Sequence, residues 1–111
     1  MRALRLSPFD RLNYISHLAL AVGHFQRGQY DEAAQAARRA VQSGPSLSTS
    51  YSLLAAALAK LGRLKEAKVV ALQVLELDPN FSAGRIRAAI GLPTALAETL
   101  VDAWSAAGLP H

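Results

Sequence analysis

The side chains that could do chemistry are few, and they do not converge. His17 and His24 stand seven residues apart, so a helix would place them on one face, but two protein ligands fall short of a zinc site. The acids Asp31, Glu32 and Glu66 fall in the first turns of predicted helices, where a carboxylate favours the helix dipole. Nucleophilic catalysis needs Ser or Cys beside His and an orienting acid, and no such group is recognisable. We therefore predict that the chain is not an enzyme and has no catalytic residue, metal site or cofactor.

The composition indicates a helical domain without disulfides. The chain has 111 residues, of which 51% are hydrophobic and only 6% aromatic, and it contains no cysteine. This length suits one domain, and the prominence of Ala and Leu suits close-packed helices better than sheets. No targeting segment is recognisable at the N-terminus, and apolar runs such as 53–59 are shorter than the roughly 20 residues of a membrane span. We predict a single domain located in the cytoplasm.

Apolar residues recurring at intervals of three and four predict six helices, separated by Gly or Pro. The interval from Pro8 to Pro45 is 37 residues, against 34 from Pro45 to Pro79, so the first helix is expected to be about one turn longer than the third. The predicted helices span residues 10–26, 30–43, 46 or 48 to 61, 64–77, 81–90 and 94–107.

One segment recurs and organises the chain. The stretch from Gln26 to Ala33 returns 34 residues later, from Lys60 to Ala67, with Gly, a large apolar residue, Glu and Ala in the same places. Each copy closes one amphipathic pattern and opens the next, as a helix–turn–helix unit does. A 34-residue period of such units is typical of stacked-helix solenoids. The predicted fold class is therefore all-α, a solenoid of helical hairpins.

The residues at the repeated positions resemble the tetratricopeptide repeat (TPR) family. The resemblance rests on Leu20, Ala21, Gly28, Tyr30, Ala33, Ala40 and Pro45 in one repeat, and on Tyr51, Leu54, Ala55, Gly62, Leu64, Ala67 and Pro79 in the next. It implies about two full repeats, at 10–45 and 46–79. The segment 1–9 would be the end of a preceding repeat, and 80–111 a degenerate repeat whose helices cap the array.

Both ends of the chain suggest a larger parent protein. The segment from Ala3 to Pro8 has the pattern of a helix end, which predicts that the chain begins inside a repeat. The segment from Leu6 to Asp10 and the ending 107–110 are similar to C-terminal TPR tails of some bacterial nucleotide cyclases and winged-helix transcriptional regulators. The resemblance implies a regulatory C-terminal domain of a larger bacterial protein.

The resemblance also implies where a partner binds. In TPR arrays the first helix of each repeat lines a concave groove, and the degenerate repeat adds Arg87. The matching groove residues of the two full repeats are Ile15, Leu18, Ala19, Val22, Phe25, Gln26, Thr49, Ser52, Leu53, Ala56 and Lys60. Because this face is mostly apolar, the expected partner is a helical or extended peptide, or a second copy of the chain. TPR proteins that hold chaperone carboxylates use Lys, Asn and Arg at positions occupied here by Leu18, Val22 and Leu53, so that activity is not expected.

The sequence leaves open whether this groove is free. Leu96, Leu100 and Trp104 stand four residues apart on the last predicted helix and form an apolar stripe. That helix, or the rest of a larger protein, could cover the groove, because large exposed apolar patches are rare on monomers.

A second class of function, nucleic-acid binding, is compatible with the net charge of +4. The basic residues that would carry it lie on the second helix of each repeat: Arg38, Arg39, Lys65 and Lys68. Basic residues are nevertheless spread over the whole chain, which favours solvated helix faces. We therefore do not expect nucleic acid to be the partner.

Overall fold

The computed structural model describes residues 11–43, 48–82, 84 and 94–110. Within these ranges the chain forms five α-helices and no strand: α1 (Arg11–Gln26), α2 (Tyr30–Ser43), α3 (Ser48–Lys60), α4 (Leu64–Leu77) and α6 (Thr94–Ala106). The predicted all-α helical repeat is confirmed. The predicted helix at 81–90 and the segment 1–9 fall largely or wholly outside the described residues. None of the described helices is both long and apolar enough to cross a membrane.

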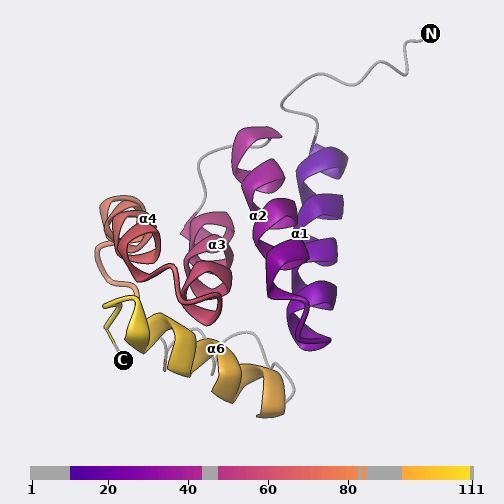
Figure 1. Ribbon diagram of the computed structural model, residues 1–111. Helices are drawn as coiled ribbons and strands as arrows, with labels where there is room; N and C mark the ends of the chain where they lie inside the picture. The colour runs from indigo at the N-terminus through magenta and orange to yellow at the C-terminus, as the bar shows by residue number, and fades with distance from the viewer. Residues whose placement is uncertain (1–10, 44–47, 83, 85–93, 111) are drawn as a thin grey trace, which may run out of the picture.

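Two helical hairpins, α1 with α2 and α3 with α4, stand next to each other in Figure 1. The helix ends lie within one residue of those expected from the sequence, and α3 begins at the later of its two expected starts. The helix α1 has 16 residues and α3 has 13, so the first hairpin has the longer leading helix that the proline spacing predicts. The difference amounts to about one helical turn.

A glycine in the left-handed conformation ends the leading helix of each hairpin. The φ angle is 77° at Gly28 and 81° at Gly62, values that a residue with a Cβ rarely adopts. At the first corner Gln29 N donates a hydrogen bond to His24 O (2.9 Å), and the second corner has the equivalent bond (3.0 Å). These bonds satisfy carbonyl groups at the helix end, as in the Schellman motif. Gly108, with φ 92°, follows α6 in the same way.

Small side chains allow the helices to pack closely around a central helix. On α2, Ala33, Ala37 and Ala40 are buried, and their size permits a short distance between helix axes. The helix α3 contacts α1, α2, α4 and α6, and every residue from Ser52 to Leu58 is buried. The core of the molecule therefore surrounds α3.

The last helix, α6, packs against α3, and its first turns reach the corner between α1 and α2 (Figure 1). Trp104 anchors it. The indole is 2% exposed, and its Nε1 donates a hydrogen bond to the backbone oxygen of Ser52 at 2.9 Å. The same ring meets Phe81 edge-on, with 5.3 Å between ring centroids and 89° between planes. Burial of the indole and satisfaction of its N–H fix the position of α6.

Candidate binding groove

The predicted groove residues of α1 form one stripe along the helix, and their burial varies from residue to residue. Leu18 and Val22 are half-buried and pack against the core, whereas Ala19 and Gln26 are exposed and Phe25 is buried. Residues three and four apart share a helix face, so these side chains follow one another along α1. Ile15 lies on the same helix, but its side chain is outside the described residues, and so is Arg87.

The predicted groove residues of α3 fall into two groups. Ser52, Leu53 and Ala56 are buried within the chain, whereas Thr49 and Lys60 are exposed. The bond from Trp104 to Ser52 O shows that α6 lies against this helix at Ser52. The helix that carries Trp104 therefore occupies part of the face that the sequence assigns to a partner.

A pocket of about 180 Å³ lies where α6 meets the corner between α1 and α2. Its lining residues are Phe25, Gln26, Tyr30, Ala95, Leu96 and Thr99. Two of them, Phe25 and Gln26, end the α1 stripe, so the pocket lies at the end of the predicted groove. Buried Leu96 and Phe25 supply apolar walls, and exposed Gln26 supplies an amide.

The hairpin corner holds the aromatic wall of this pocket in place. Phe25 and Tyr30 lie on either side of Gly28 and meet edge-on, with 5.1 Å between ring centroids. His24 Nδ1 and Gln29 Oε1 form a hydrogen bond of 2.8 Å across the same turn. Lys60 reaches over from α3 and places Nζ 5.4 Å from the centroid of the Tyr30 ring, a cation–π distance.

Four of the pocket residues were not among those predicted from the sequence: Tyr30, Ala95, Leu96 and Thr99. Tyr30 is recognisable as a repeat position, where its expected role is packing. Leu96 belongs to the apolar stripe of the last predicted helix. No local pattern indicates that the stripe on residues 94–107 meets Phe25, because that contact joins segments about 70 residues apart in the chain.

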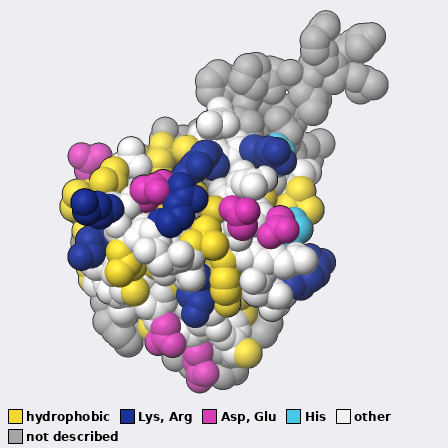
Figure 2. Space-filling model, in the orientation of Figure 1, with side chains coloured by type: hydrophobic (Ala, Val, Ile, Leu, Met, Phe, Trp, Pro, Cys, Tyr) yellow, Lys and Arg dark blue, Asp and Glu magenta, His cyan; other side chains and the backbone are white. Residues whose placement is uncertain are grey.

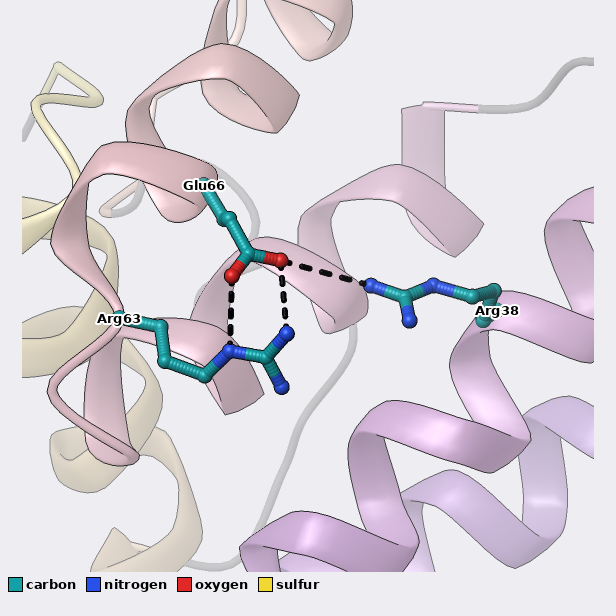
Figure 3. A network of polar contacts seen from close by, with 3 residues as sticks. All are labelled: Arg38, Arg63 and Glu66. Carbon is teal, nitrogen blue, oxygen red and sulfur yellow. Dashed lines mark hydrogen bonds and ion pairs between the residues drawn. The ribbon is translucent and has the colours of Figure 1, made fainter.

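The acidic residue Glu66 lies among the basic residues of α2 and α4. Arg63 donates to both carboxylate oxygens of Glu66, with Nε and Nη2 each 2.8 Å away (Figure 3). Arg38 Nη2 approaches the same carboxylate at 4.0 Å and connects the two hairpins. Side chains of both signs lie mixed on the face shown in Figure 2. This surface is not a continuous basic patch, although Arg38, Arg39, Lys65 and Lys68 are all exposed.

The two histidines that share a face of α1 have different surroundings. His24 is bonded to Gln29, whereas His17 is half-buried, with Nδ1 buried and without a hydrogen-bond partner in the described part of the chain. Across residues 11–43, 48–82 and 94–110, His, Asp and Glu do not gather in groups of three that could hold a metal ion.

The sequence model of the family described as Tetratricopeptide repeat matches residues 24–91, more than half of the 111 residues. No curated protein and no solved structure matches the chain.

Proposed function

The chain belongs to the tetratricopeptide repeat family, whose repeats are non-catalytic modules for protein–protein interaction, and we propose that it binds a protein partner through the part of the groove that α6 leaves open. The observation that carries this proposal is the pocket at the end of the α1 stripe. A partner would run along Leu18, Ala19 and Val22 and place one apolar side chain between Phe25 and Leu96.

The dimensions of the pocket suit a side chain better than a small ligand. Its volume of about 180 Å³ is below the roughly 300–1,000 Å³ of small-molecule sites, and it is large enough for one Leu or Phe side chain. Apolar anchors presented by a helical or extended peptide are the usual ligands of such grooves. The peptide would belong to another protein or to a second copy of the chain.

Polar groups at the rim would orient this peptide. Gln26 and Lys60 are exposed, and Lys60 is held over the Tyr30 ring next to the pocket. Thr49 is exposed on α3 and belongs to the same predicted groove. Ser52, Leu53 and Ala56 would join the contact surface only if α6 moved away, because they are buried in the present arrangement.

The test is to fill the pocket without disturbing the core. Ala95 is exposed and lines the pocket, so Ala95→Trp would occupy the space of the anchor residue. Ala106→Trp, on the exposed side of the far end of α6, is the matched control. Phe25→Glu is unsuitable because Phe25 is only 2% exposed, and an unpaired buried carboxylate would unfold the domain.

Peptides selected from a random displayed library against the full chain serve as the probe. We expect the selected sequences to share an apolar residue, and we expect Ala95→Trp to weaken their binding at least ten-fold. Binding to Ala106→Trp should equal that of the unmodified chain. A library that yields no binder, or binders that tolerate Ala95→Trp, would refute the proposed groove.

Two further predictions from the sequence belong with this proposal. The regulatory role in a larger bacterial protein rests on the resemblance of the chain ends, and the coding sequence upstream of Met1 would test it. Nucleic-acid binding is the alternative function, and the carboxylate of Glu66 between Arg38 and Arg63 argues against it.

A further inference from the structure

The outer face of α4 carries an apolar pair that the other described residues leave exposed. Val69 is 60% exposed and Leu72 is 64% exposed, the highest values among the large apolar side chains described. They are three residues apart and therefore adjacent on the helix surface. The buried residues of the same helix, Ala67, Val70, Ala71 and Val74, lie on the opposite side. In Figure 1, α4 stands at the edge of the molecule away from α1.

The repeat architecture does not require apolar residues at these two positions. The equivalent positions of the first repeat, 34 residues earlier, are Gln35 and Arg38, both exposed and polar. The two helices have the same place in their hairpins, so packing within the repeat is satisfied by polar side chains on this face. Packing within the hairpin therefore does not explain why Val69 and Leu72 are apolar.

Charged residues extend the apolar pair in a self-complementary order. Lys65 lies one turn before Val69, and Glu76 lies one turn after Leu72, with intervals of four, three and four residues. These are the intervals of a coiled-coil seam, which keeps one line of side chains facing a partner helix. Over the described residues, neither Lys65 nor Glu76 has an ion-pair partner, and both are exposed.

We propose that this seam, Lys65–Val69–Leu72–Glu76, is the contact between two copies of the chain, with the two α4 helices antiparallel. A two-fold axis midway between Val69 and Leu72 sets Val69 of each copy against Leu72 of the other. The same axis sets Lys65 against Glu76 of the second copy at both ends, so two ion pairs close the apolar centre. A two-fold interface must be self-complementary, and the order Lys65–Val69–Leu72–Glu76 meets this requirement.

The flanks of the seam are compatible with this pairing. Glu66 lies on one flank and is already bonded to Arg63, whereas Lys68 lies on the other flank. In an antiparallel pair, each flank of one α4 helix faces the same flank of the other α4 helix. The two Lys68 residues therefore lie on the same side of the contact, but they are offset by five residues, which separates their charges by about 7.5 Å along the helix axis. Figure 2 shows apolar, basic and acidic side chains together at the edge of the molecule where α4 lies.

The contact is small, so the association is weak. A seam of four residues buries less than the roughly 1,200 Å² of a stable interface, which places it among transient contacts. The expected dissociation constant lies between about 1 µM and 1 mM. This surface is separate from the pocket at Ala95, so the two proposals succeed or fail independently.

The test is sedimentation equilibrium of the full chain from about 10 µM to 1 mM at low salt. Replacing the apolar pair by the residues of the first repeat, Val69→Gln with Leu72→Arg, should give a monomer. Both positions are exposed, so the far-UV circular dichroism should be unchanged. A chain that is monomeric up to 1 mM, or a double variant that still associates, would overturn the proposal.

Charge reversal then distinguishes the antiparallel pair from other arrangements. Lys65→Glu alone and Glu76→Lys alone each place like charges together at both ends, which should weaken the dimer roughly ten-fold. An equimolar mixture of the two single variants restores both ion pairs between unlike chains and should associate as the unmodified chain does. Asp102→Lys, on the exposed face of α6, is the control and should have no effect. If the mixture remains as weak as the single variants, the antiparallel register is wrong.

Discussion

Replacing Trp104 tests whether α6 is held against α3 as the structure shows. The variant Trp104→Phe keeps an aromatic ring against Phe81 but removes the N–H that bonds to Ser52 O. Loss of this bond and of part of the ring should lower the free energy of unfolding by about 1–2 kcal/mol. The variant Trp104→Ala removes the whole ring from a site that is 2% exposed, which should cost about 3–5 kcal/mol. Domains have about 5–15 kcal/mol in total, so the second variant should lose a large part of its stability.

The assay is urea denaturation followed by far-UV circular dichroism for the unmodified chain and both variants. Trp104 is the one Trp of the chain, so its fluorescence reports on the docking of α6 alone. Emission of the unmodified chain should be that of a buried indole and should shift in the same transition as the helicity. Ser105→Ala, at the exposed neighbouring position, should stay within about 0.5 kcal/mol of the unmodified chain. A Trp104→Ala variant within about 1 kcal/mol of the unmodified chain would refute the packing described for α6.

Three further results are expected. Gly62→Ala should lower the free energy of unfolding by about 1–2 kcal/mol, because φ is 81° at this position. Apart from the two neighbouring residues, no described residue lies within 4 Å of the added Cβ, so the cost is conformational, and an unchanged urea midpoint would contradict the left-handed corner. Ser50→Ala should raise the free energy of unfolding by about 1 kcal/mol, because Ser50 Oγ is buried without a hydrogen-bond partner in the described part of the chain; a loss of stability in the same titration would point to a hydrogen bond there. Titration of the full chain with mixed DNA and RNA at low salt should show no binding, whereas affinity that falls steeply with salt would favour the nucleic-acid alternative.

The fold could be predicted because its signals are local. Gly28 and Gly62 mark positions where the backbone must be left-handed, and both have positive φ angles in the structure. Pro45 and Pro79 interrupt the helical pattern because proline has no N–H and clashes with the preceding turn. Each of these effects depends only on residues within one or two helical turns, so it can be predicted from the local sequence. The ends of α1, α2, α4 and α6 follow from such signals to within one residue, whereas the sequence leaves the start of α3 open between residues 46 and 48.

The surface available to a partner could not be predicted in the same way. The stripe of Leu96, Leu100 and Trp104 shows that the last helix has an apolar face, but the whole leading helix of each repeat is apolar enough to receive it. Which surface is covered depends on a contact between residues 52 positions apart, from Trp104 to Ser52. Burial of Ser52, Leu53 and Ala56 follows from tertiary packing of α3 and not from their own sequence pattern.

The spacing of apolar residues in the sequence assigns Ala67, Val70, Ala71 and Val74 of α4 to the inner side, and all four are buried in the structure. It does not single out the exposed pair, because two apolar residues between Lys65 and Glu76 form no continuous stripe. The small residues Ala67 and Ala71 are buried, while the larger Val69 and Leu72 are exposed, the reverse of what side-chain size alone would favour. The face with Ala67 and Ala71 is the buried one because only small side chains permit a close approach of helix axes.

The two proposed surfaces lie far apart, and this arrangement has a consequence for binding. In Figure 1, α4 is at one edge of the molecule, and the corner of α1 and α2 that borders the pocket is at the other. Two copies joined through α4 would therefore present two pockets on the outer ends of the pair. A target with two suitable segments would be held by both, and its second contact would form at the effective concentration set by the first. A weak dimer can in this way raise the overall affinity for a repeated target without any direct coupling between the pocket and α4.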